Sequence, residues 1–125
     1  MKRCAAGLLF KDNQILLGKR TMNRKFYPNV WDLIGGHCKK NENVEQALSR
    51  ELQEEIDVIP TKYVHITILH EPEPEIHGKY DYHIFLVTEW LGFPKNKQSN
   101  EHSELRWFEI NDAEKLDLAH QKYPD

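Results

Sequence analysis

The 125-residue sequence has only two cysteines and no long hydrophobic run. Cys4 and Cys38 are too few, and too far from other ligand types, to suggest a disulfide framework or a zinc site. The apolar run from Cys4 to Phe10 is too short for a signal peptide or a membrane span. Because nothing marks export, we expect a reduced, cytoplasmic protein without membrane contacts.

The sequence also lacks an excess of positive charge. Its 17 basic and 20 acidic residues give a net charge of −3, which offers no general footprint for a nucleic acid polymer. A phosphorylated small molecule would have to be attracted by local cations or by bound metal. The length, without repeats or linkers, predicts one domain over residues 1–125. For the assembly, both a monomer and a homodimer remain open.

Hydrophobic patterning predicts mostly strands. Lys11-Asp12-Asn13 reads as the turn of a hairpin, and prolines between Glu71 and Gly78 predict a mobile loop. Asn111 resembles the start of a short helix. The predicted strands are 3–10, 14–20, 30–34, 62–70, 80–90 and 107–110, with 80–90 central.

A longer helix is predicted after Asn43, which can act as its N-cap, with Gln46 completing a capping box. Val44 is then the first helical residue. Apolar side chains recur at helical spacing and predict a buried stripe. The stripe consists of Val44, Ala47, Leu48, Leu52 and Ile56.

Acidic residues fall on the same face of this helix. At about 100° per residue, Glu51 and Glu55 lie inside the apolar stripe and Glu54 lies at its edge. Buried carboxylates cost several kcal/mol unless they are paired or bind a cation, and Arg50 alone leaves excess negative charge. Hard divalent cations bind such oxygen clusters, so we expect a metal site. The alternative is a solvated helix with an ordinary Arg50–Glu54 pair.

The spacing of these residues resembles the signature of the Nudix hydrolases, G-x5-E-x7-R-E-U-x-E-E-x-G-U, where U is aliphatic. The one departure is Asp57, where the family has a glycine that closes the helix in a left-handed conformation. Asp is among the few other residues that tolerate this conformation. The matching positions are Gly36, Glu42, Arg50, Glu51, Leu52, Glu54, Glu55 and Val58.

A second pattern resembles the MutT-type nucleoside triphosphate pyrophosphohydrolases within this family. It comprises W-x-G-x-P at Trp90 to Pro94, and Glu101 six residues before Trp107. In those enzymes a loop glutamate approaches the metal cluster, which favours Glu101, with Glu104 as the competing position.

The resemblance implies the Nudix fold, an α/β (α+β) fold in which a mixed β-sheet is sandwiched between α-helices. It also implies Mg²⁺ or Mn²⁺ and attack of water on a nucleoside diphosphate linkage, with a (d)NTP or oxidised (d)NTP giving a monophosphate and pyrophosphate. Arg50 would orient a carboxylate, Arg20 would bind phosphate, and Glu42 would support the loop. The implied catalytic residues are Arg50, Glu51, Glu54 and Glu101, and the implied metal ligands are Gly36, Glu51, Glu54, Glu55 and Glu101.

His120 stands where the MutT type reads the base with asparagine. Imidazole and amide differ in hydrogen-bonding geometry, so a broader purine or a cytosine nucleotide remains open. Two other functions compete with this hypothesis. One is a Nudix hydrolase of ADP-ribose or dinucleoside polyphosphates, and the other is a Nudix-fold binding or regulatory module without chemistry. The intact Arg50 and its neighbouring glutamates argue against the second.

Overall fold

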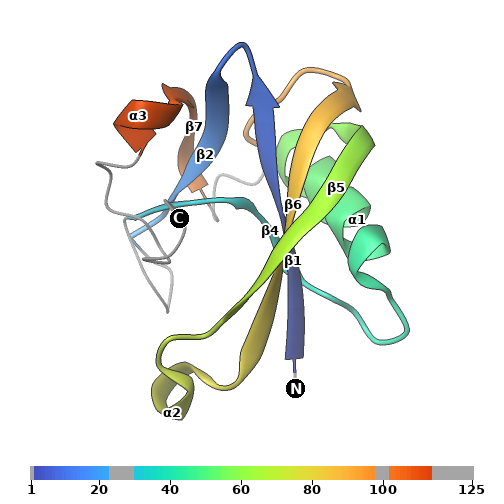
Figure 1. Cartoon of the computed structure of the whole chain (residues 1–125), viewed down its shortest axis with the longest axis vertical. Helices are drawn as coiled ribbons and strands as arrows, with labels where there is room; N and C mark the ends of the chain where they lie inside the picture. The colour runs from blue at the N-terminus through green and yellow to red at the C-terminus, as the bar shows by residue number, and fades with distance from the viewer. Residues whose placement is uncertain (1, 23–29, 98–101, 114–125) are drawn as a thin grey trace.

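The computed structural model describes residues 2–22, 30–97 and 102–113, in which strands dominate (Figure 1). No helix in these ranges is long and apolar enough to span a membrane. Cys4 and Cys38 are free thiols. The elements in chain order are β1 (Lys2–Lys11), β2 (Gln14–Arg20), β3 (Trp31–Asp32), β4 (Ile34–His37), α1 (Val44–Ile56), β5 (Ile59–His70), α2 (Pro74–His77), β6 (Tyr80–Leu91), β7 (His102–Glu109) and α3 (Ile110–Ala113).

The sheet is organised around β1. Residues 2–9 of β1 pair in parallel with β6, and β4 pairs antiparallel with the other edge of β1. The end of β1 turns through Asp12 and Asn13 into β2, as the hairpin prediction required. β2 pairs antiparallel with both β3 and β7, and β5 pairs antiparallel with β6. One parallel pair among antiparallel ones confirms a mixed sheet, with β6 inside it.

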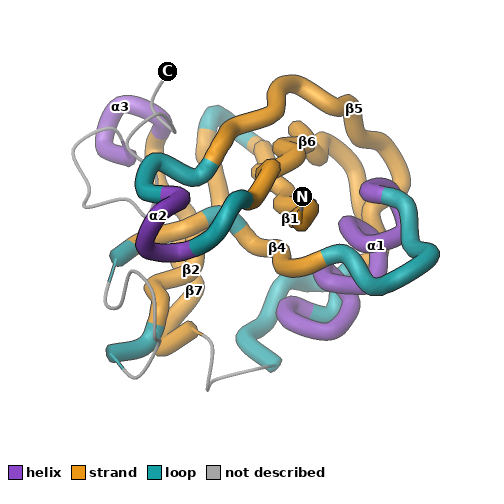
Figure 2. The backbone as a smooth tube through the Cα atoms, turned by 90° about the horizontal axis from the view of Figure 1, so that it is seen from below, coloured by secondary structure: helices purple, strands orange, loops and turns teal. Residues whose placement is uncertain are grey.

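Helix α1 packs its predicted stripe on one face of this sheet. Ala47, Leu48, Leu52 and Ile56 are fully buried, and they share a core cluster with Leu9, Phe85 and Val87 of the strands. Full burial of such a side chain stabilises the fold by about 1.5–3 kcal/mol. A second cluster comprises Leu17, Trp31, Leu33 and Ile84. Figures 1 and 2 show α1 and α3 on opposite sides of the strands, so the predicted layers are confirmed.

Several predicted boundaries were wrong. The segment 30–34 does not form one strand, because Trp31–Asp32 pair with β2 as β3 and Ile34 begins β4, in which Gly35 and Gly36 pair with β1. The last strand begins at His102, five residues before Trp107, because its whole length pairs with β2. The helix predicted from Asn111 begins at Ile110. Pro74, at a first helical position, begins the short helix α2 inside the predicted loop.

Candidate active site

The site is built on α1, whose ends are both capped. The Asn43 side chain accepts a hydrogen bond from the Gln46 backbone N–H at 2.8 Å, and the Asn43 N–H donates to the Gln46 side chain at 3.0 Å. At the other end Asp57 has φ 63° and ψ 37°, and its N–H donates to the Leu52 carbonyl. The predicted capping box and the left-handed closure at Asp57 are therefore confirmed. The caps fix the register in which the glutamates face the sheet.

Gly36 of β4 brings its backbone against the Glu51 carboxylate. A Cβ at position 36 would lie 2.8 Å from both carboxylate oxygens, so a side chain there would displace the acid. Gly35 is equally constrained, because its Cβ would lie 2.1 Å from the Ala5 carbonyl oxygen of β1. The two glycines are thus required by close approach, and they put strand backbone and helix carboxylate side by side.

Arg50 is the centre of a network of acceptors. Its Nη1 donates to Glu51 at 2.8 Å and to Glu54 at 3.2 Å. Its Nε and Nη2 donate to the two oxygens of Glu42 at 2.8 and 2.9 Å. Nη2 also donates to the His37 carbonyl at 2.9 Å. A guanidinium has five N–H donors, so these contacts use all of them, and Arg50 acts by holding carboxylates in place.

Glu42 links this network to the loop between β4 and α1. Its Oε1 also accepts the Lys39 backbone N–H at 2.9 Å. The hydrogen bonds from Arg50 and from the Lys39 amide lower the pKa of Glu42 to about 2. Reciprocally, Glu42 and then Glu51 hold the pKa of Arg50 above its usual range. Glu42 therefore has the loop-supporting geometry that was expected of it, with a carboxylate that stays ionised.

Glu55 lies on the buried side of the same helix. It is 1% exposed, and its Oε1 lies 3.2 Å from Nε2 of His102, which is 2% exposed. The His102 ring also covers Gly18, where a Cβ would meet Nδ1 at 2.6 Å. Asn96 donates to the His102 carbonyl at 2.7 Å. His102 thus joins α1, β2 and the segment before β7 at one point.

The segment before β7 is also fastened to the end of α1 by backbone hydrogen bonds. The N–H groups of Lys95 and Lys97 donate to the carbonyls of Ile56 and Glu55 at 3.0 and 2.9 Å. The Lys95 and Lys97 ammonium groups lie 3.4 and 3.5 Å from the Asp57 carboxylate. Asp57 therefore has a partner in this chain that a glycine could not have.

The other predicted site residues lie outside the Arg50 network or outside the residues that the structure describes. Arg20 lies at the end of β2, where its Nη1 donates to Asp32 at 3.1 Å. Glu104 pairs with Arg106 at 2.9 Å on an exposed part of β7. Glu101 and His120 lie outside the described residues, so their roles stay predictions. The sequence analysis missed His102, the partner of Glu55, and Asp32, the partner of Arg20. The position of Glu55 in the apolar stripe indicated that it needs a partner, but no sequence spacing identified His102 or Asp32.

The donors beside Gly36 have the chemistry that a hard divalent cation requires, namely carboxylate and carbonyl oxygens. Glu51 and Glu54 approach the same Arg50 nitrogen, so their carboxylates come together at one end of the network. Within residues 2–22, 30–97 and 102–113, no three acidic, His or Cys side chains are arranged as a complete metal site. The described residues therefore fit part of such a site, and the ligand assignments stay predictions.

A capped helix that carries Arg50 and three glutamates against a Gly-Gly strand, beside a mixed sheet, defines a Nudix-type centre. The model of the NUDIX domain family matches residues 1–124. This chain therefore belongs to the Nudix hydrolase family, for which divalent metal ions are typical.

The relatives agree with a MutT-type Nudix hydrolase, and a solved structure shows the same fold. Over 88% of this chain and 84% of the other, the fold superposes with a TM-score of 0.82 on a MutT Nudix hydrolase from Burkholderia pseudomallei that is 24% identical. An 8-oxo-dGTP diphosphatase from Proteus vulgaris is 36% identical over 69% of this chain and 75% of its own.

Two further relatives have other names. A CTP pyrophosphohydrolase from Escherichia coli is 27% identical over 99% of this chain and 87% of its own. An ADP-ribose pyrophosphatase from Methanocaldococcus jannaschii is 30% identical over 93% of this chain, which spans 66% of the archaeal protein. The three names share a nucleotide with a diphosphate linkage, and they differ in the rest of the substrate.

Proposed function

We propose that this protein is a divalent-metal-dependent hydrolase of nucleoside triphosphates, ordinary or oxidised, that releases the monophosphate and pyrophosphate. The observation that carries the proposal is the Arg50 network, in which one guanidinium holds Glu51 and Glu54 together beside the Gly36 backbone. A solvated helix would not need an arginine with all five donors engaged. The two free thiols of the protein, Cys4 and Cys38, fit a reducing, cytoplasmic compartment.

The chain's own residues would act by orientation. Arg50 fixes Glu51 and Glu54, and Glu42 fixes Arg50 to the loop. We assign the Gly36 carbonyl and the carboxylates of Glu51, Glu54, Glu55 and Glu101 as the groups that would hold Mg²⁺ or Mn²⁺. When bound, such ions lower the pKa of water and neutralise phosphate charge. Arg20 of β2 pairs in register with His102 of β7, and it would bind the phosphate beside these ions.

The choice of substrate is supported by the relatives. Two names, 8-oxo-dGTP diphosphatase and CTP pyrophosphohydrolase, describe hydrolysis of a nucleoside triphosphate, which agrees with the MutT-type pattern at Trp90–Pro94. ADP-ribose is the second candidate, because the archaeal relative is 30% identical over 93% of this chain. His120 remains our assignment for contact with the base.

A substrate panel tests the proposal. The purified protein is incubated with Mg²⁺ or Mn²⁺ and each of the dNTPs and NTPs, 8-oxo-dGTP and ADP-ribose, and products are separated by ion-exchange chromatography. We expect a monophosphate and pyrophosphate from at least one triphosphate, and loss of activity in EDTA that added metal restores. ADP-ribose as the best substrate would favour the second candidate. No hydrolysis of any compound by folded protein would favour a binding module.

A further inference from the structure

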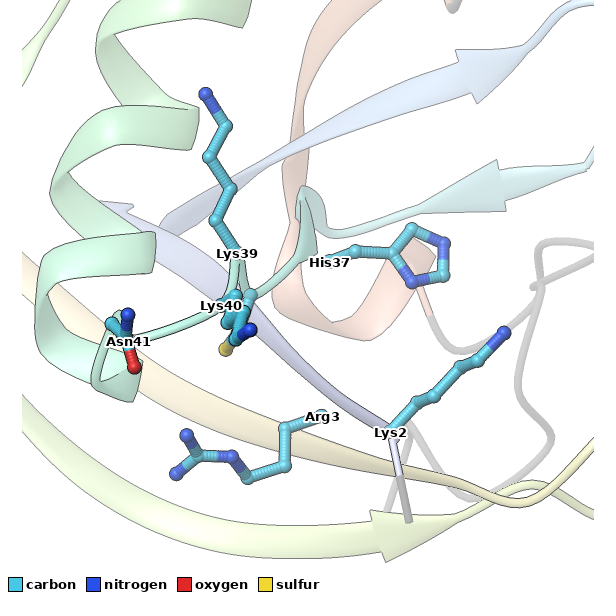
Figure 3. A pocket seen from close by; sticks show the side chains of 7 residues that line it. Lys2, Arg3, His37, Lys39, Lys40 and Asn41 are labelled. Carbon is cyan, nitrogen blue, oxygen red and sulfur yellow. The ribbon is translucent and has the colours of Figure 1, made fainter.

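A hollow of about 440 Å³ lies between the start of β1 and the loop from β4 to α1. Four of the seven residues that line it are Lys or Arg, and none is Asp or Glu. Figure 3 shows these side chains around the loop. The lining residues are Lys2, Arg3, His37, Cys38, Lys39, Lys40 and Asn41.

The four cations differ from many others of the chain in their pairing. Lys2, Arg3, Lys39 and Lys40 make no ion pair with any described residue. By contrast, each of Arg20, Arg50, Lys62, Lys95, Lys97 and Arg106 has a carboxylate partner. Lys2 lies 5.6 Å from the Tyr80 ring centroid, and Arg3 donates to the Glu42 backbone carbonyl at 3.2 Å.

The carboxylate of this loop feels the charge of Lys39, but its hydrogen-bonded side-chain partner is Arg50. The Glu42 carboxylate, the acidic group of this loop, already accepts from Arg50 and from the Lys39 amide. Like charges held around one hollow repel one another, in a chain whose net charge is −3. An anion that enters the hollow would remove this repulsion.

We infer that the hollow is a binding site for a condensed phosphate, an anion with several charges along its length. In Figure 3 the side chains of Lys2 and His37 extend to the right, that of Arg3 extends to the left, and that of Lys39 extends upward. Cations spread in this manner suit an elongated oligophosphate better than a single phosphate group, which needs donors that converge on one point.

The hollow is connected with the candidate active site through the backbone of the loop. The Cys38 N–H donates to the Arg3 carbonyl at 2.9 Å, and Arg50 donates to the His37 carbonyl. The identity of the phosphate rests on the proposed function, because that reaction both consumes and releases condensed phosphate. Two sources share this chemistry: free pyrophosphate, and the terminal phosphates of a bound nucleotide.

Calorimetric titration with sodium pyrophosphate in metal-free buffer tests the binding site without any hydrolysis. We expect the Lys39→Ala/Lys40→Ala variant to bind about tenfold more weakly than wild type, equivalent to about 1.4 kcal/mol. The matched control is Lys95→Ala/Lys97→Ala, which removes two lysines at the other end of α1 and should leave affinity unchanged. Higher salt should weaken wild-type binding. Absence of wild-type binding, or equal affinity in both double variants, would overturn the inference and leave the proposed hydrolysis untouched.

Steady-state kinetics on the best substrate then distinguish the two sources. If the terminal phosphates of the nucleotide occupy the hollow, Lys39→Ala/Lys40→Ala should raise KM several-fold with little change in kcat. If free pyrophosphate occupies it, KM should stay constant and the inhibition constant of pyrophosphate should rise. Either result supports the site. Unchanged KM together with unchanged inhibition would refute it.

Discussion

Two carboxylate centres lie on α1, and they have opposite environments. Glu51 and Glu54 meet Arg50, with Glu54 44% exposed, at the side of the helix that faces Gly36. Glu55 meets His102 where both side chains are almost completely buried. The first centre contains a permanent cation, because an arginine side chain does not lose its proton in proteins. The second contains a residue whose charge depends on its surroundings.

The difference separates two tasks within one motif. At the Arg50 centre, one guanidinium meets three carboxylates, so negative charge remains in excess, and the Glu54 carboxylate stays within reach of solvent. At the Glu55 centre, the contact fixes the end of α1 to β7 and β2, because His102 also covers Gly18. Substitutions at the first centre should therefore affect chemistry with little loss of stability, whereas substitutions of Glu55, which we also assign as a metal ligand, should lower stability as well. The following experiments test this difference.

The largest expected effect is on turnover. Glu54→Gln keeps the size of a half-exposed side chain and removes its charge, so kcat should fall about 100-fold or more while the melting temperature changes little. Steady-state kinetics and thermal denaturation on the same preparation measure both quantities. Glu104→Gln is the matched control, since Glu104 pairs with the exposed Arg106 and should retain activity. A fully active Glu54→Gln would identify Glu54 as an ordinary solvated side chain and not a metal ligand.

The next largest effect is on stability at the buried centre. Glu55→Ala leaves the His102 imidazole buried beside a cavity, which should lower the free energy of unfolding by about 3 kcal/mol. Glu54→Ala, one position earlier but half exposed, should cost less than about 0.5 kcal/mol. Urea denaturation of both variants gives the comparison directly. Equal losses would remove the distinction between the two centres.

The third effect is a pH dependence at the Arg50 centre. The folded-state pKa of Glu42, about 2, lies below its unfolded value, so the contribution of Glu42 to stability is complete above about pH 4.5 and is lost as pH falls toward 2. Between pH 5 and pH 2, the free energy of unfolding from urea denaturation should therefore fall less steeply for Glu42→Gln than for wild type. If the free energy of unfolding depended on pH equally in the two proteins, the hydrogen bonds between Arg50 and Glu42 would not form in solution.

Local patterns in the sequence predicted the helix and its caps. Asn43, Gln46 and the apolar spacing act within a few residues, so they identify α1 to the residue, and the left-handed Asp57 follows from the same register. The position of Glu55 inside the buried stripe was also predictable, because the helical wheel fixes it once the register is known. The hairpin and the interior position of β6 likewise follow from strand patterning.

Contacts between distant segments could not be predicted in this way. The partner of Glu55 is His102, 47 residues away, and no spacing rule connects them. The predicted strand 30–34 stopped before Gly35 and Gly36, yet both glycines belong to β4 because their backbone pairs with β1. The early start of β7 at His102 depends on pairing with β2, a non-local interaction that the polar sequence around Ser103 and Glu104 does not show.

The smallest expected effect concerns Asp57, which joins the end of α1 to the segment before β7. Its left-handed conformation costs a non-glycine residue roughly 1 kcal/mol, while ion pairs with Lys95 and Lys97 offset part of this cost at low salt. Asp57→Gly should therefore change the free energy of unfolding by less than about 0.5 kcal/mol at low ionic strength, and should become stabilising by up to about 1 kcal/mol in high salt, where the ion pairs of the wild type are screened. Urea denaturation at two salt concentrations measures the difference, with Lys95→Ala/Lys97→Ala as the variant that removes the same ion pairs and keeps the backbone. Turnover should stay within about twofold of wild type, because Asp57 contacts neither Arg50 nor His102 among the described residues. A large loss of kcat without loss of stability would instead make Asp57 a positioning residue for the segment that leads to Glu101.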